Sequence, residues 1–200
     1  MLNNSMTHRG VLFGASALTV ASTLPAFALN EAGATKLINS VVGQINSVIA
    51  SGKSESAMIR EFETIFVRYS DVPTIARYTL GVAARSASRA ELNAFTDAFT
   101  GYISRKYGKR FREFAGGRLE VQQTKAVKSF YEVKTLAYLP SSSPFDVTFL
   151  VSDKSGKDLF FNMFIEGVNL LLTEREEVGA MLDRRGGNIG ALIEDLKKAG

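Results

Sequence analysis

Apolar residues in the first half of the chain recur every three to four positions, the spacing of one face of an α-helix. This pattern predicts amphipathic helices over residues 31–51, 54–69 and 72–82, followed by a longer helix over residues 88–115. An aromatic stripe runs along one side of the last helix, and the glycine pair after it is expected to end it. The first half of the chain is therefore predicted to be helical.

Residues that favour helix starts precede three of these segments. Ser54 or Ser56 can cap the second helix, and Asp71 can cap the third. Ser88, followed three residues later by Glu91, is a capping-box pattern for the fourth helix. These residues set the expected helix boundaries.

From residue 118 onward the apolar positions alternate with polar ones, which is the two-residue period of a β-strand. Strands are predicted near residues 119–121, 131–139, 145–151 and 159–165, with short turns rich in Pro, Ser and Gly between them. Short turns between consecutive strands imply an antiparallel, curved sheet.

Helical spacing returns after the strands. Thr173 and Glu176 form a second capping-box pattern, and Asn188 can cap a last helix. The order of elements predicts an α+β fold in which N-terminal helices pack on a curved antiparallel sheet of about four strands. Two C-terminal helices complete it, and an apolar cleft is expected between sheet and helices.

The predicted strand over residues 159–165 is apolar on both faces, because Phe160, Phe161, Met163 and Phe164 follow each other with little polar interruption. Neither face of such a strand can lie freely in water. The strand must therefore be covered by helices, by another part of the sheet or by a ligand.

Composition supports one domain with a sizeable core, since 46% of the 200 residues are hydrophobic. The formal net charge is +4, and the basic residues are scattered along the chain. Nucleic-acid binding usually needs a concentrated basic surface, so no nucleic-acid partner is expected.

Residues 1–28 have the pattern of a cleaved secretory signal peptide. Arg9 precedes an uncharged apolar stretch from Val11 to Leu24, and Ala26-Phe27-Ala28 is a small-x-small cleavage site. The alternative is a membrane anchor, but the stretch is shorter than the roughly 20 residues that span a bilayer. We therefore expect export to the periplasm and a single domain over residues 29–200.

Most side-chain catalysis is excluded by composition. The chain has no cysteine, and its only histidine, His8, lies in the expected signal peptide. Thiol nucleophiles, Ser-His triads and Cys/His zinc sites are thereby excluded from the mature protein. We expect no enzyme activity, no metal and no cofactor. The alternative, an enzyme, would use acids or bases such as Tyr131, Asp146, Asp153 or Glu166.

The sequence resembles the MlaC, or toluene-tolerance, family of periplasmic phospholipid-binding proteins over residues 31 to 198. The segments that carry the resemblance are Tyr69-Ser70-Asp71-Val72, Tyr78-Thr79-Leu80-Gly81, Phe95 to Phe99 ahead of Tyr107, Ile165-Glu166-Gly167-Val168-Asn169-Leu170, and Arg175.

The resemblance implies a soluble carrier that shuttles phospholipid between an outer-membrane lipoprotein complex and an inner-membrane ABC transporter complex, which maintains outer-membrane lipid asymmetry. We expect such a carrier to be a monomer. Where family members usually have an aromatic residue after Gly81, and Trp and Asp before the Glu-Gly pair, this chain has Val82, Asp158 and Asn162. Two alternatives therefore stay open: a carrier of another envelope lipid such as a hopanoid, and a ligand-free envelope adaptor.

A lipid carrier needs a dry channel lined by apolar side chains, with the charged head group left in solvent. Each candidate lining residue could equally be ordinary core. The candidates are Phe62, Phe66, Phe99, Ile103, Val147, Phe149, Phe161, Met163 and Ile165.

Charged residues suggest two further roles. Glu166 and Gly167 are expected to form the corner between strand and helix, with Glu166 paired to Arg175 or Arg85. Arg105, Lys106 and Lys109 form a basic cluster on the long helix, which is either a solvated face or a docking surface for an acidic partner or anionic lipid.

Overall fold

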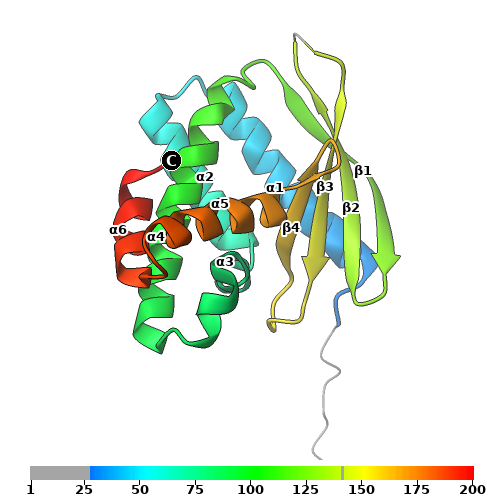
Figure 1. The fold of residues 1–200 in the computed structure, drawn as a ribbon. Helices are drawn as coiled ribbons and strands as arrows, with labels where there is room; N and C mark the ends of the chain where they lie inside the picture. Colours follow the sequence, from blue (N-terminus) through cyan, green and yellow to red (C-terminus); the bar gives the residue numbers. More distant parts are fainter. Residues whose placement is uncertain (1–27, 141) are drawn as a thin grey trace, which may run out of the picture.

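A five-stranded antiparallel sheet with strand order β1-β2-β3-β4-β5 forms one side of the molecule (Figure 1). The computed structural model describes residues 28–140 and 142–200, so nearly all of the expected signal peptide lies outside the described residues. The strands are β1 (Arg118–Val127), β2 (Phe130–Tyr138), β3 (Phe145–Ser152), β4 (Leu159–Ile165) and β5 (Val168–Asn169).

Six α-helices make up the rest of the fold. They are α1 (Glu31–Ala50), α2 (Glu55–Tyr69), α3 (Val72–Leu80), α4 (Arg89–Gly108), α5 (Leu170–Arg184) and α6 (Ile189–Lys198), with 3-10 turns η1 (Gly81–Arg85) and η2 (Lys109–Arg112). α1 packs along the sheet, and α4 packs between α2 and α6 (Figure 1). The predicted α+β fold is confirmed, with one short strand, β5, that the sequence pattern did not indicate.

Most predicted helix starts are confirmed. The side chains of Ser54, Asp71 and Asn188 each accept a hydrogen bond from a backbone N–H in the first turn of the following helix. Ser88 and Glu91 form a complete capping box at the start of α4, with Ser88 N donating to Glu91 Oε2 at 2.8 Å. Short polar side chains therefore fix these boundaries locally.

The start of α5 differs from the prediction. The helix begins at Leu170, because the Asn169 side chain accepts from Leu172 N at 3.1 Å and caps it earlier than Thr173 would. Asn162 on β4 donates to Asn169 Oδ1 at 3.0 Å and accepts from Leu171 N at 3.2 Å. Buried Asn162 and half-buried Asn169 thus join the sheet to the helix.

The fourth helix is also shorter than predicted. α4 ends at Gly108 and continues only as the 3-10 turn η2, whereas the pattern predicted helix to residue 115. A Cβ on Gly108 would lie 2.7 Å from the Cα of Ile59, so α2 and α4 approach each other closely there. Tightening of the last turn to 3-10 geometry is common at helix ends.

Strand register brings the apolar side chains of β3 and β4 together. Phe149 pairs with Met163, and Val147 pairs with Ile165. On the other side of β3, Thr135 pairs with Val147 and its buried hydroxyl donates to Val147 O at 2.8 Å. No residue of β4 is exposed, in agreement with the prediction that both faces of this strand are covered.

None of the helices formed by residues 28–140 and 142–200 is long and apolar enough to cross a membrane.

Replacing Ser88 with Ala should destabilise the protein by about 1 kcal/mol, because the first turn of α4 loses its N-cap acceptor. The matched control is Ser40→Ala, since Ser40 is exposed and bonds only within its own helix. Urea unfolding followed by circular dichroism measures both variants. Equal midpoints for Ser88→Ala and Ser40→Ala would show that the capping box adds no stability.

Candidate lipid-binding cavity

A cavity of about 700 Å³ lies between the sheet and the helices. Its wall is built mainly by apolar side chains of α1, α2, α4, β3, β4 and α5. Every candidate residue named from the sequence lies on this wall: Phe62, Phe66, Phe99, Ile103, Val147, Phe149, Phe161, Met163 and Ile165. Their contact with a lipid stays a prediction, but the structure brings all of them to one space.

Aromatic rings form one side of the cavity. The ring of Phe62 lies 6.0 Å from that of Phe66, 6.3 Å from that of Tyr107 and 5.5 Å from that of Phe111, measured between centroids. Phe62 and Phe66 are one helical turn apart and share a face of α2. The close approach of α2 at Gly108 brings them against the end of α4.

Several lining residues were not predicted. Phe111 and Phe114 belong to the aromatic stripe, so their spacing could have identified them. Further apolar lining residues lie along α1 and near the ends of strands and of α5, where periodicity is weaker. They include Ile45, Ile49, Leu119, Leu139, Phe145, Leu170 and Leu171.

A cluster of charged and phenolic side chains lies at the α4–α5 side of the mainly apolar wall. Lys106 Nζ donates to Glu174 Oε1 at 2.7 Å and to Glu177 Oε2 at 2.5 Å. Tyr107 Oη also donates to Glu174 Oε1, and Tyr102 Oη donates to Glu177 Oε2 at 2.9 Å. We call these five residues the polar cluster. It joins α4 to α5.

Burial shapes the electrostatics of the polar cluster. Burial and the neighbouring Glu174 carboxylate raise the pKa of Tyr102 and of Tyr107 above the usual phenol range. Burial alone would raise the pKa of Glu177, but hydrogen bonds from Lys106 and Tyr102 outweigh it, so the pKa is lowered. The phenols are therefore neutral donors, and Glu177 is an ionised acceptor, near neutral pH.

Two of the three basic residues predicted to form a cluster on the long helix bond to other elements, and the docking role of the cluster stays a prediction. Arg105 donates to the backbone oxygens of Ala199 at 2.8 Å and Leu196 at 2.6 Å, which fastens the end of α6. Lys106 belongs to the polar cluster. Only Lys109 is exposed, and it lies at the cavity. The pattern of charges resembled a solvated face because the partners lie far away in sequence.

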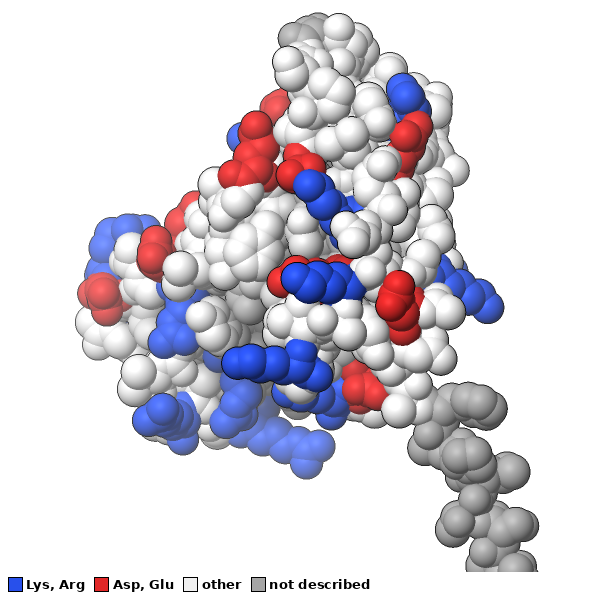
Figure 2. All heavy atoms as spheres, turned by 90° about the vertical axis from the view of Figure 1, so that its right-hand side faces the viewer, with Lys and Arg blue, Asp and Glu red and all other residues white. Residues whose placement is uncertain are grey.

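The side of the molecule formed by the sheet has its own group of basic side chains, away from the long helix. Figure 2 shows Lys and Arg concentrated at the lower end of this side, with acidic and basic side chains mixed above. The β1–β2 and β3–β4 turns lie at that end of the molecule (Figure 1). Lys128 and Lys154 belong to these turns, and Lys154 Nζ donates to Ser129 Oγ at 2.9 Å, which links the two.

The corner after β4 is a tight turn with an unexpected charge arrangement. Glu166 and Gly167 have φ values of 50° and 81°, both in the left-handed region that favours glycine. The predicted ion pair between Glu166 and Arg175 or Arg85 does not form among the described residues. Glu166 instead lies exposed at the cavity, and Arg175 stacks over Tyr78 at 4.8 Å from the ring centroid.

The four residues considered as catalytic acids or bases do not lie in one site. Asp146 pairs with Lys134 at 2.9 Å, near the end of β4 that carries Glu166. At the other end of the sheet, Asp153 accepts from Leu29 N at 3.0 Å and Tyr131 donates to Leu29 O at 3.3 Å. In the part of the chain that the structure describes, no three His, Cys, Asp or Glu side chains are placed to hold a metal ion.

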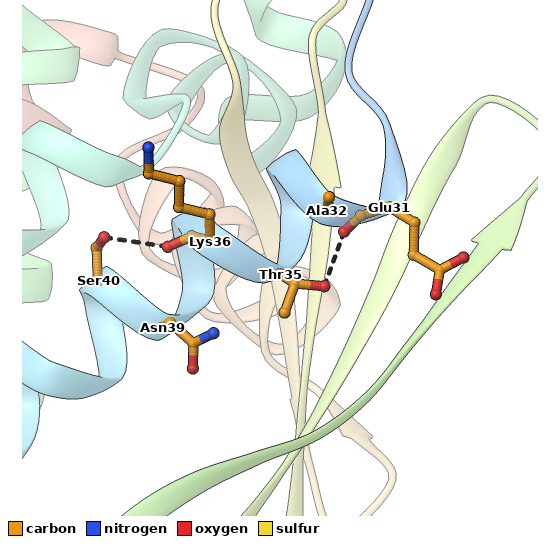
Figure 3. Close-up of a pocket in the computed structure, with 6 residues that line it drawn as sticks. All are labelled: Glu31, Ala32, Thr35, Lys36, Asn39 and Ser40. Atoms are coloured by element: carbon orange, nitrogen blue, oxygen red, sulfur yellow. Dashed lines mark hydrogen bonds between the residues drawn. The ribbon is translucent and has the colours of Figure 1, made fainter.

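A second, open hollow follows the polar face of α1 (Figure 3). The hydroxyls of Thr35 and Ser40 donate to Glu31 O at 2.7 Å and to Lys36 O at 3.0 Å, and the Thr35 hydroxyl also lies 2.6 Å from that of Thr124 on β1. The side chains of Glu31, Lys36 and Asn39 are exposed. This surface has neither the depth nor the apolar lining of the cavity.

Two comparisons relate the chain to known proteins. The family model described as MlaC protein matches residues 36–198. The fold also resembles that of the phospholipid-binding protein from Ralstonia solanacearum, solved in complex with a phospholipid, with a TM-score of 0.71 and 15% sequence identity. The match covers 82% of this chain and 95% of that one. At this identity the likeness establishes a shared fold.

Replacing Lys106 with Met should lower the free energy of unfolding by about 3 kcal/mol, the lower end of the range for breaking a buried ion pair. The reason is that Glu174, whose side chain is 5% exposed, would keep a buried charge without its cation, while the Lys106 side chain is 25% exposed. Urea unfolding measures the loss. Lys109→Met is the control and should change stability by less than about 0.5 kcal/mol. Similar small effects for both variants would contradict a buried ion pair.

Tyr102 and Tyr107 should resist ionisation at alkaline pH. Phenols ionise near pH 10 in unfolded chains, and both pKa values are raised in the folded protein. Their contacts therefore contribute full stability below about pH 10 and lose it as pH rises further. Phenolate absorbance should show a late step coincident with unfolding, which disappears in the Tyr102→Phe, Tyr107→Phe double variant. Early ionisation of all six tyrosines would contradict this.

Proposed function

The chain belongs to the MlaC family, and from this premise we propose that it is a periplasmic phospholipid carrier. In this role it takes up a phospholipid by its acyl chains and moves it between an outer-membrane lipoprotein complex and an inner-membrane ABC transporter complex. Its cellular effect would be to maintain outer-membrane lipid asymmetry. The export pattern of residues 1–28 supports a periplasmic location.

The cavity is the observation that carries this proposal. Its volume of about 700 Å³ lies within the roughly 300–1,000 Å³ of ligand pockets, and its lining is mainly apolar. Burying a CH₂ group is worth about 0.8 kcal/mol, so a sixteen-carbon acyl chain represents on the order of 10 kcal/mol of transfer free energy. A soluble carrier needs such a space because an acyl chain is poorly soluble in water.

Carriage is favoured over catalysis. The acids and the phenol considered for catalysis are divided between two ends of the sheet, and the chain after residue 28 contains neither histidine nor cysteine. The family relationship and the phospholipid bound to the protein of similar fold both support a lipid ligand. A hopanoid carrier would use the same apolar cavity. Identification of the bound lipid distinguishes this alternative from a phospholipid carrier.

Organic extraction of the purified mature protein, followed by mass spectrometry, should release a diacyl phospholipid. Uptake from labelled vesicles into the soluble fraction should follow the protein concentration. Recovery of a hopanoid would replace phospholipid as the ligand. Absence of any lipid, together with absence of uptake, would refute the carrier proposal and favour a ligand-free adaptor.

Replacing Met163 with Asp should reduce lipid uptake by about tenfold or more, because a carboxylate facing acyl chains costs more than the 1.4 kcal/mol that corresponds to tenfold. Val67→Asp is the matched control, since Val67 is 55% exposed on α2 and does not line the cavity. Ile45→Trp tests the same wall by filling space without adding charge. Normal uptake by folded Met163→Asp and Ile45→Trp proteins would show that lipid binds elsewhere.

A further inference from the structure

We propose that the surface formed by α3, η1 and the start of α5 is a contact site for an anionic lipid bilayer. This inference goes beyond the proposed function but rests on it, because it takes the cargo to be a membrane lipid. We call this site the α3–α5 surface. Its residues are Arg77, Tyr78, Val82, Arg85, Val168 and Leu172.

Exposed apolar side chains are concentrated on the α3–α5 surface. Val82 is 71% exposed, Val168 54%, Leu172 43% and Tyr78 40%. Among the large apolar side chains of the described residues, Val67 on α2 is the only other one that is similarly exposed. A single exposed apolar residue is normal, whereas several on adjoining elements mark an interaction site.

Packing of α3 against α5 joins these side chains into one surface. Arg175 on α5 lies over the Tyr78 ring of α3, 4.8 Å from its centroid. A Cβ on Gly81, the first residue of η1, would lie 3.7 Å from Arg175 Nη2, so η1 also begins beside this arginine. Leu172 precedes Arg175 by three positions, on the same side of α5. The surface therefore extends from η1 across α3 to the start of α5.

The arginines of this region favour an anionic partner. Arg77 and Arg85 are exposed, and neither forms an ion pair within residues 28–140 and 142–200. Arg85 follows Val82 by three positions in a 3-10 helix, where such side chains are aligned. Glu166 and Glu176 are exposed carboxylates nearby in sequence, and the two arginines together with Arg175 outnumber them. Anionic head groups would therefore attract this surface.

The α3–α5 surface is continuous with the wall of the cavity. Val168 lines the cavity and is also exposed to solvent. Leu170 and Leu171 line the cavity directly before the exposed Leu172. This short segment therefore has apolar side chains toward both the cavity and the solvent. Contact with a bilayer through it would bring the cavity wall close to the acyl chains that the protein is proposed to carry.

A bilayer fits this surface better than an acidic protein does. A stable protein interface buries about 800 Å² on each partner and uses roughly 20–30 residues a side, whereas the exposed apolar side chains here are few. Aliphatic side chains flanked by basic ones are typical of segments that lie in the plane of a membrane, and Tyr is enriched at that depth. Such contact is weak and reversible, which suits a carrier that must leave the membrane again.

Fluorescence tests the contact, because the chain has no tryptophan and a single introduced one reports its own position. Val82→Trp and Leu172→Trp proteins should show a blue shift of emission, and quenching by brominated acyl chains, when phosphatidylglycerol vesicles are added. The shift should disappear when the vesicles are removed, which separates bilayer contact from lipid held in the cavity. Gln123→Trp is the control, since Gln123 is exposed on β1, at the opposite edge of the sheet from β5. An equal response of the control, or no response at Val82 and Leu172, would overturn the site.

Vesicle flotation tests the charge. The Arg77→Gln, Arg85→Gln double variant should bind phosphatidylglycerol vesicles about tenfold more weakly than wild type, which corresponds to about 1.4 kcal/mol. The Lys125→Gln, Lys128→Gln double variant is the matched control, because it removes the same charge from exposed positions at the β1–β2 turn. Binding of the wild type should weaken with added salt and with phosphatidylcholine vesicles. An equal loss in both double variants would reflect net charge alone and would overturn the site.

Uptake and contact are separate measurements, so the two proposals fail separately. Lipid in the soluble fraction after removal of the vesicles measures carriage, whereas protein on the vesicles measures contact. Contact without uptake would refute the carrier function. Uptake without contact at Val82 and Leu172 would refute only the bilayer site and would favour an acidic protein as the partner of the α3–α5 surface.

Discussion

The structure depends on holding an apolar cavity open inside a closely packed fold. Cavities created in protein cores cost roughly 24 cal/mol per Å³, so a dry, empty space of about 700 Å³ would cost on the order of 17 kcal/mol. That exceeds the 5–15 kcal/mol by which whole domains are stable. The space must therefore be filled or wetted, and a ligand with a long apolar part fills it with the largest gain. The apolar wall and the proposed lipid would in this sense form one core.

The framework around the cavity meets this demand with contacts that join the elements at its border. α4 is fixed to α2 by the close approach at Gly108 and to α6 by the hydrogen bonds of Arg105. α5 is fixed to β4 through Asn162 and Asn169. These joints are polar or close-packed, and none requires apolar side chains to close over the centre. The helices can therefore remain apart where the acyl chain is expected.

Local signals in the sequence were sufficient for the architecture and for the apolar wall. Helical and strand periods predicted the elements, and the serine and aspartate caps predicted most helix starts, because these features depend on neighbours within four residues. Prediction failed where the partner is distant. Asn169 capped α5 in place of Thr173 with support from Asn162, and Arg105 and Lys106 turned inward to residues on α5 and α6. The residues next to a charged side chain on a helix do not indicate which distant group it will contact.

Separation along the sequence also explains why the contacts of Glu174 were not predicted. In sequence it is one of several acidic residues near a helix start, where carboxylates commonly stabilise the dipole. Only the turn at Glu166 and Gly167, followed by the early start of α5, brings it opposite Lys106 and Tyr107. Because that turn also ends the most apolar strand, one corner sets both where the acyl-chain wall stops and where the charged groups begin. The boundary between apolar and polar parts of the cavity is therefore encoded in the strand-to-helix connection.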